Sequence, residues 1–490
     1  MYRTLCRLRP HDAEMAVAVS TRFKETAKRK GRKEDGPLTP PLPRRWSLTP
    51  GDLYLLIGGA ALLIGGMWVR HGGASLFADP IGAIAAVGQL TALYGTLLAL
   101  IGILLMSRAP WIEQVVGSDE AARLHRLAGF ASVWLLVVHA LASTAAFVSG
   151  DSIATPGQIL DGIVDFTVRQ EGGVGATVAI GLFILVAFVS IRAARSFLAY
   201  ETWYGIHLYV YIAVALGFTH QIALGSDFVG DALARNTWIA LYAIAFVPLI
   251  LFRFLTPIFR NLRHQYYVDE VVMERTGVVS LWVAGRELDQ LPVRAGQWFS
   301  IRALTADGWW RSNPFSISAG PDARRLRFTI EAVGDGSRRL QRLLPGTRLF
   351  LEGPYGLLTG AVRTREKVLL IAGGIGITPL RALLEVLPAR RGDLALMYRV
   401  PSKETLVFKR ELQHLADARN AEVAFVTGSR ESFAFRDDPL SAAGLNAAYP
   451  DILERDVYLC GSPRMMDKVE ESLHELGMPK VQVHLERFGW

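Results

Sequence analysis

The sequence predicts a membrane protein in two parts, a six-helix transmembrane bundle and, after it, an antiparallel β-barrel and an α/β domain with a parallel sheet. Three observations predict this multidomain fold class. Six apolar segments lie before residue 257, each near the ~17–25 residues that a membrane helix needs. From His264 onward, short β-rich runs alternate with Gly and Pro turns. After Arg365 strands and helices alternate, which is typical of a parallel sheet.

Composition supports this division. The chain has 490 residues, enough for two to four domains, and 51% of them are hydrophobic. A mean hydropathy of +0.26 is high for a soluble protein. Cys6 and Cys460 are the only cysteines, which excludes a disulfide framework or a cysteine zinc site. The net charge of +8 could suggest nucleic acid, but its distribution favours a membrane face, so no nucleic-acid partner is expected.

The chain is expected to divide into four segments. Residues 1–50 are basic, broken by prolines and without a secretory signal pattern, which indicates a disordered cytoplasmic tail. Residues 51–260 form the bundle, 264–362 the barrel and 363–490 the α/β domain. The expected spans are 52–69, 81–106, 124–148, 174–191, 203–224 and 238–255. Arginines concentrate in the loops on one side, so we expect an integral plasma- or inner-membrane protein with both termini cytoplasmic.

Two of these spans carry a histidine near each end: His125 and His139 in one, His207 and His220 in the other. Spacings of 14 and 13 residues separate each pair by roughly 20 Å along its helix. Ionisable residues in membrane spans are functional by default, and imidazole is the usual axial ligand of haem iron. The pattern therefore predicts two stacked haems, the inner held by His125 with His207 and the outer by His139 with His220. Ordinary buried histidines are the alternative, which two matched pairs disfavour.

The second pair also predicts an irregular helix. At ~100° per residue, 13 residues miss the starting face by about 140°. We therefore expect non-α geometry between His207 and His220, with Gly217 as the plausible place.

A strand, a glycine turn and a helix follow one another in residues 367–387. Gly373, Gly374 and Gly376 let backbone amides approach a pyrophosphate, and Thr378 can cap the helix while Pro379 fits its first turn. A helix N-terminus then faces the anion. A tight turn without a ligand is the alternative, and the flanking strand and helix favour the nucleotide.

Several short motifs accumulate along the later part of the chain. The first is Arg311-Ser312-Asn313-Pro314-Phe315-Ser316; the others are Gly334-Asp335-Gly336-Ser337, Gly353-Pro354-Tyr355-Gly356, Gly373-Gly374-Ile375-Gly376, Cys460-Gly461 and Glu486-Arg487-Phe488-Gly489-Trp490. Together they resemble the ferredoxin–NADP reductase superfamily. With the paired histidines, residues 50–490 resemble its NADPH oxidase/ferric reductase branch. This resemblance implies six spans with two haem b groups, an FAD barrel and a nicotinamide-binding domain.

The resemblance also implies roles for residues in the barrel. Asn313, Pro314, Phe315 and Ser316 resemble the segment that holds the flavin and its phosphates. Relatives have His or Arg in the first position, so Arg311 is expected to substitute for the charge that Asn313 lacks. Gly334 and Ser337 resemble the loop that donates amides and a hydroxyl to the FAD phosphates, with a plain turn as the alternative.

In the α/β domain, Cys460 and Gly461 resemble the cysteine segment beside the nicotinamide, with a buried core cysteine as the alternative. Trp490 resembles the terminal aromatic residue that stacks on the isoalloxazine, with a frayed terminus as the alternative. Ser429 and Arg430 resemble a site for the 2′-phosphate of NADPH, and Arg399 adds charge, which favours NADPH over NADH.

These residues predict an oxidoreductase that moves electrons from cytoplasmic NADPH through FAD and two haems to an acceptor on the outer face. Oxygen-reducing relatives place an arginine near the outer haem, whereas this chain has Gln89, with Arg70 and His71 at the boundary. The acceptor therefore stays open between O₂, giving superoxide, and ferric or cupric chelates. Two alternatives are an electron-donating subunit for a periplasmic partner and a haem-free transporter-like bundle fused to a reductase. Membrane lipid is an expected partner, and no calcium switch is expected.

Overall fold

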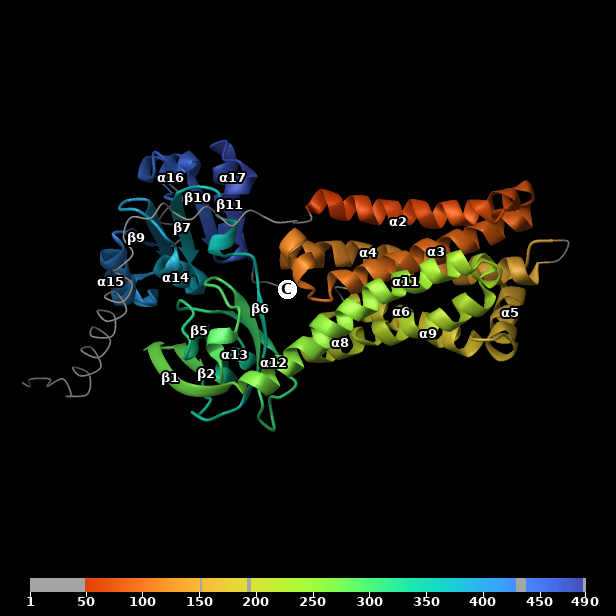
Figure 1. The fold of residues 1–490 in the computed structure, drawn as a ribbon, viewed down its shortest axis with the longest axis horizontal. Helices are drawn as coiled ribbons and strands as arrows, with labels where there is room; N and C mark the ends of the chain where they lie inside the picture. Colours follow the sequence, from red (N-terminus) through yellow and green to blue (C-terminus); the bar gives the residue numbers. More distant parts are fainter. Residues whose placement is uncertain (1–48, 150–151, 192–194, 429–437, 488–490) are drawn as a thin grey trace, which may run out of the picture. The chain divides into compact units, whose positions relative to one another are not determined.

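The computed structural model describes residues 49–149, 152–191, 195–428 and 438–487 (Figure 1). The tail expected over residues 1–50 therefore lies outside the described residues, apart from its last two.

Six helices of the described part are long and apolar enough to cross a membrane, one for each expected span. Three of them contain interruptions, since α4 is kinked at Gly117, α8 passes into α9, and α11 continues through the π-helical segment η2 into α12. They are α2 (Pro50–Arg70), α3 (Pro80–Leu105), α4 (Pro110–Val148), α6 (Gly173–Ser190), α8 with α9 (Tyr200–His207 and Tyr209–Leu224), and α11, η2 and α12 (Ala232–Pro248, Leu249–Leu255 and Thr256–His264). Figure 1 shows these helices running alongside one another.

Local sequence explains where these helices begin. Thr49 and Asp52 form a capping box at the start of α2, and the Asp79 side chain accepts from two amides at the start of α3. Pro80 and Pro110 occupy first helical positions, where proline's missing N–H costs nothing. Short segments outside the spans, which were not expected, are η1 (Gly73–Ala78), α5 (Pro156–Arg169) and α10 (Ser226–Val229).

Glycines spaced seven residues apart bring α3 close to α4. A methyl group added at Gly88 would lie 2.5 Å from Ser143 Oγ, and one at Gly95 would lie 3.1 Å from Leu135 Cβ. The Ser132 hydroxyl donates to the Gly95 carbonyl at 2.7 Å. Small residues let membrane helices pack backbone against backbone, so this seam fixes the register of α4 on α3.

The barrel consists of two three-stranded antiparallel sheets, ordered β1-β2-β5 and β4-β3-β6. Isolated bridges Tyr267 to Arg348 and Ile317 to Phe328 join the sheets. Phe299 and Phe328 meet edge to face at 5.7 Å in the buried core. The elements are β1 (Tyr267–Arg275), β2 (Val278–Ala284), β3 (Trp298–Ala303), β4 (Asn313–Ser316), β5 (Arg325–Glu331), β6 (Leu349–Tyr355) and α13 (Asp335–Leu340).

The α/β domain has a five-stranded parallel sheet of order β11-β10-β7-β8-β9. Strand order reverses at β7, so the carboxyl ends of β7 and β10 open a crevice of the kind that binds ligands in such sheets. The elements are β7 (Lys367–Gly373), β8 (Leu394–Val400), β9 (Glu422–Thr427), β10 (Arg455–Cys460), β11 (Val483–Leu485), α14 (Ile377–Val386), α15 (Lys409–Arg419), α16 (Ala442–Ala448) and α17 (Pro463–Glu475). The predicted fold class, a membrane bundle with a barrel and a parallel α/β domain, is confirmed.

Strand β6 joins the barrel to the membrane part. Arg260 of α12 donates to the Gly353 carbonyl at 2.6 Å. The Asn261 side chain donates to the Leu351 carbonyl and accepts from the Leu351 amide, both at 2.8 Å. Each polar group of this junction has a partner across it, so the barrel is held against the last membrane helix.

Candidate functional site

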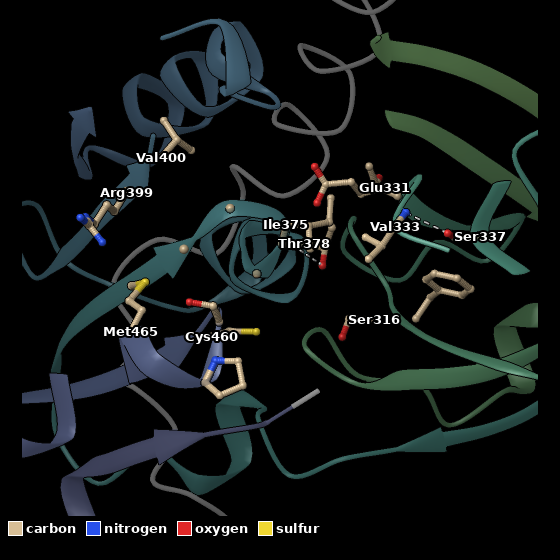
Figure 2. Close-up of a pocket in the computed structure, with 18 of the residues that line it drawn as sticks. Ser316, Glu331, Val333, Ser337, Ile375, Thr378, Arg399, Val400, Cys460 and Met465 are labelled. Atoms are coloured by element: carbon tan, nitrogen blue, oxygen red, sulfur yellow. Dashed lines mark hydrogen bonds between the residues drawn. The ribbon is translucent and has the colours of Figure 1, made fainter. Parts of the chain in front are cut away.

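A cavity of about 710 Å³ is lined by barrel and α/β residues, a size in the usual range for a small-molecule site (Figure 2). Most of the residues that the sequence singled out for nucleotide binding line it together. These are Asn313, Pro314, Phe315, Ser316, Gly334, Ser337, Gly373, Gly374, Gly376, Thr378, Arg399, Cys460 and Gly461.

The turn after β7 consists largely of glycine because a side chain there would either strain the backbone or collide with a neighbouring residue. Gly374 has φ +55°, in the left-handed region. A methyl group at Gly376 would collide with the Cys460 carbonyl, and one at Gly373 would collide with the Met465 sulfur. The ends of β7 and β10 thus approach each other closely, and their glycines line the cavity, as a pyrophosphate site requires.

The predicted capping role of Thr378 is wrong. A 3-10 turn, Gly374–Gly376, leads directly into α14 at Ile377, so Thr378 already lies in the first helical turn. Its hydroxyl donates backward to the Ile375 carbonyl at 3.0 Å. Pro379 lies in the first turn as predicted. The helix start has no side-chain cap, which leaves its amides available to an anion.

On the barrel side of the cavity, Asn313 packs against the start of α13. A methyl group at Gly336 would lie 2.5 Å from Asn313 Oδ1, so the start of α13 packs directly on this side chain. The Ser337 hydroxyl accepts from the Val333 and Gly334 amides at 3.0 and 2.9 Å (Figure 2). The loop expected at the FAD phosphates is therefore ordered by its own serine.

Arg311 does not line the cavity. Its Nε lies 3.8 Å from the Glu201 carboxylate, in the first turn of α8. The structure thus directs this guanidinium toward the membrane part, and its expected compensation for Asn313 stays a prediction.

Cys460 ends β10 and is buried, and burial raises the pKa of its thiol, which therefore stays neutral. Glu486 is a buried acid that the sequence singled out only as part of the closing motif. Its carboxylate lies against Gly356, and Oε2 has no hydrogen-bond partner in the described residues. Burial, with the nearby Asp119 and Glu113 charges, raises the pKa of Glu486 well above its ordinary value.

Three predicted residues, Ser429, Arg430 and Trp490, lie outside the described residues. Arg399, at the end of β8, lines the cavity (Figure 2). Of the residues predicted to bind the 2′-phosphate of NADPH, the structure therefore describes only Arg399. It does not describe the aromatic residue that was predicted to stack on the flavin.

The membrane part brings the four histidines together in two pairs. The rings of His125 and His207 are centred 5.8 Å apart, and those of His139 and His220 are centred 6.3 Å apart. The first histidine of each pair lies on α4, and the second comes from α8 or α9.

Helix geometry changes between the two histidines of α8 and α9. The first helix ends at His207 and the next begins at Tyr209, with Leu208 between them. The Tyr211 amide donates to the Leu208 carbonyl at 3.1 Å, a three-residue return typical of a tighter turn. The predicted non-α geometry is confirmed, but Gly217 as its place is wrong, since Gly217 lies inside α9.

The Nδ1 atoms of three of the rings lie within hydrogen-bonding distance of neighbouring helices, whereas Nδ1 of His220 has no hydrogen-bond partner among the described residues. Nδ1 of His125 lies 3.1 Å from the Gly102 carbonyl, and Nδ1 of His139 lies 3.0 Å from the Gly88 carbonyl. Nδ1 of His207 is 3.4 Å from the Ser190 hydroxyl. A ring whose Nδ1 donates to a carbonyl keeps Nε2 free of a proton, which is the tautomer that a metal requires.

The boundary residues expected near the acceptor contact one another. His71 lies between two carboxylates, 3.0 Å from Asp227 and 2.9 Å from Asp231, and Arg70 also pairs with Asp231. Trp68 donates to Gln89 at 2.7 Å. The Arg70 and His71 contacts attach the end of α2 to α10 and the start of α11, and the Trp68 contact attaches α2 to α3.

Comparisons with known proteins agree with this geometry. The family "Ferric reductase like transmembrane component" matches residues 91–218, and "Oxidoreductase NAD-binding domain" matches residues 370–471. Ferredoxin--NADP reductase B of Sorangium cellulosum is 32% identical over 209 residues, which are 40% of this chain and 84% of that protein. The chain belongs to the ferric reductase-like membrane proteins with a ferredoxin–NADP reductase module.

This ferric reductase-like protein is similar to others over its module, and to one solved structure over more of its length. A glycine betaine monooxygenase reductase subunit of Pseudomonas aeruginosa is 27% identical over 250 residues, 48% of this chain and 68% of that protein. A flavohemoglobin structure from Malassezia yamatoensis has 18% identity and a TM-score of 0.42, covering 81% of this chain and 96% of that one.

Membership of this family indicates the general function of the protein. The protein is an integral membrane oxidoreductase whose module binds FAD and NAD(P)H and transfers electrons.

Proposed function

We propose that this protein carries electrons from cytoplasmic NADPH through FAD and two haem b groups to an acceptor on the outer face of the membrane. The two facing histidine pairs carry the proposal. They lie about 20 Å apart along α4, since 14 residues at ~1.5 Å separate His125 from His139.

The histidine pairs fit haem iron by distance and by ligand number. A metal bound at about 2.0–2.1 Å by two opposed imidazole nitrogens holds the ring centres roughly 6 Å apart. The observed separations are 5.8 and 6.3 Å. No cluster of three or more His, Cys, Asp or Glu in the described part of the chain could hold a bare metal ion. The two imidazoles of each pair would instead complete the ligand set of a haem iron, whose other ligands a porphyrin would provide. Such a haem would supply one-electron chemistry.

The residues around the rings support the same role. The Gly88 and Gly102 carbonyls are 14 residues apart on α3, matching the spacing of His139 and His125 on the antiparallel α4. One helix therefore bonds Nδ1 of both rings of the other, which leaves each Nε2 available to a metal. This is the outer-shell support that metal-bound histidines use.

The cavity would hold the two nucleotides. Asn313 to Ser316 with Gly334 and Ser337 would hold FAD, and the turn from Gly373 to Gly376 with Thr378 and Gly461 would hold the NADPH pyrophosphate beside Cys460. FAD held there would supply the chemistry that links two-electron hydride transfer to one-electron transfer. Arg399 supports NADPH, since a guanidinium suits the 2′-phosphate dianion; Ser429, Arg430 and Trp490 complete this proposal outside the described residues. Arg399→Ser should then raise KM for NADPH more than KM for NADH.

The proposed sidedness places both termini in the cytoplasm, because six spans return the chain to its starting side. Domain boundaries of 51–260, 264–362 and 363–490 fit this arrangement, with the last two segments cytoplasmic. His125 and His207 would then hold the inner haem, nearest the barrel.

The proposed acceptor is a small molecule at the outer haem edge, either O₂ or a ferric or cupric chelate. Turnover of each by the isolated protein distinguishes these from donation to a periplasmic redox partner, which would leave the isolated protein without an acceptor.

The test is a visible spectrum of the purified, FAD-supplemented protein under anaerobic conditions during addition of NADPH. Sharp reduced b-type bands support the proposal, and their absence after both NADPH and dithionite would overturn it. His139→Ala and His125→Ala should each lose one haem. His414→Ala, at an exposed histidine of α15, should retain both.

A further inference from the structure

We propose that the loop 304–310 of the barrel is a membrane-contact surface, with Trp309 and Trp310 inserted among the lipid headgroups on the side where the barrel lies. The occupant is the bilayer that surrounds the protein's own spans. This inference rests on the protein being integral to a membrane and not on the proposed haems.

The loop exposes large aromatic side chains. It connects β3 to β4, and Trp309 and Trp310 are 59% and 43% exposed, with ring centres 5.8 Å apart. Leu304, at the start of the loop, is also exposed. Indole combines an apolar body with an N–H donor, and tryptophan is enriched where membrane meets water.

One end of the loop contacts the membrane part directly, and the other contacts it through Glu352 of the barrel. Before the loop, Arg302 donates to Glu352 at 2.6 Å, and that carboxylate lies 3.7 Å from Arg253 in η2. After the loop, Arg311 lies 3.8 Å from Glu201, in the first turn of α8. A short loop between two such attachments must lie on the side of the barrel that faces the spans.

The neighbouring helix α12 indicates the depth of this region. The continuous segment Ala232–His264 has 33 residues, about 50 Å of helix at ~1.5 Å per residue, against a hydrocarbon core of about 30 Å. Its end must therefore extend into or beyond the headgroup layer.

The side chains of α12 agree with that position. Arg260 and Asn261 bond to β6 of the barrel, whereas Phe259 is 64% exposed and Ile258 and Leu262 are also exposed. A helix with Arg260 and Asn261 on the protein and its apolar side chains exposed matches a lipid interface beside the barrel. Phe197 and Tyr200, at the start of the α8 span, are exposed aromatics of the same kind.

The test places a probe on the loop of the full chain in lipid nanodiscs. In a Cys6→Ser background, Trp309→Cys is labelled with an environment-sensitive fluorophore, since Cys460 is buried. Quenching is measured with headgroup-level nitroxide lipids and with aqueous iodide. The matched control is Met273→Cys, a 67% exposed position on β1, six residues (~20 Å) along the strand from its start beside α12.

The proposal expects the probe at 309 to be quenched severalfold more by nitroxide lipid than the probe at 273, and less by iodide. Equal quenching at both positions would overturn it. Protection from iodide without lipid quenching would also overturn it, because a second protein copy would then cover the loop. FAD content of each labelled variant reports folding, and Trp310→Cys repeats the measurement if Trp309→Cys loses FAD.

Discussion

Replacement of Gly88 by alanine should remove the outer haem while leaving the inner one in place. The substitution adds one methyl group where α3 meets α4. That methyl would lie 2.5 Å from Ser143 Oγ and 3.0 Å from the Ser143 backbone nitrogen. A hydroxyl can rotate away, but the backbone nitrogen cannot, so the helices must move apart.

The size of the movement follows from these distances. Favourable contacts lie at about 3.5–4.0 Å, so a 3.0 Å approach requires a local separation of roughly 0.5–1 Å. The bond from His139 Nδ1 to the Gly88 carbonyl, now 3.0 Å, would lengthen beyond hydrogen-bonding range. Overpacking costs about 1–3 kcal/mol and the lost bond about 1 kcal/mol. Loss of such outer-shell support typically lowers metal affinity by about 10–100-fold.

The assay is haem per chain by pyridine haemochromogen absorbance, with thermal unfolding in the same detergent. Gly88→Ala should approach one haem per chain, and the retained haem should have the wild-type midpoint potential. Gly129→Ala is the matched control, because Gly129 lies on α4 and a methyl group there meets nothing within 4 Å. Two haems with unchanged potentials in Gly88→Ala would refute the argument that this seam positions His139.

Three further predictions concern the reductase module and its junction. Glu486→Gln should flatten the pH dependence of stability. The raised pKa of Glu486 means that folding favours its protonated form, so wild-type thermal stability should fall more than the variant's as pH rises above the ordinary glutamate pKa of 4.5. In the native protein at pH 8, Cys460 should be alkylated far more slowly than free cysteine, and after unfolding the two rates should be similar. A rate in the native protein equal to that of free cysteine would contradict the burial of Cys460. Arg253→Met removes a partner of the buried Glu352 and should slow haem reduction by NADPH, while reduction of a soluble dye is retained. The control Arg263→Met, at an exposed pair with Glu287, should lower the free energy of unfolding by only ~0–1 kcal/mol. Identical rates of haem reduction in the two variants would exclude a role for the buried pair.

Much of the fold could be predicted because its signals are local. The length and polarity of each apolar segment predict a span, and alternation of strand and helix predicts the parallel sheet. The residues of the cavity were predicted from motifs, and the structure brings them together although Asn313 and Gly461 are far apart in sequence.

The failures concern contacts that a local pattern does not contain. Thr378 was expected as a cap because its residue type suits one, but the preceding glycines continue into the helix. The interruption at Leu208 lies beside His207, nine residues before the glycine that was expected to mark it. Helix α5 was missed because 14 residues are too few for a span. Burial of Glu486 against Gly356 joins chain positions 130 residues apart, which periodicity cannot indicate.

The matched spacing of Gly88 with Gly102 and of His125 with His139 restricts how this bundle can change length. One inserted residue between the two glycines would rotate one carbonyl by about 100° and leave its histidine unsupported. Seven inserted residues on each helix would restore the register within about 20° and lengthen the segment by about 10 Å. Insertions and deletions should therefore accumulate outside this segment, and any homologue that tolerates one within it should carry a compensating change on the facing helix.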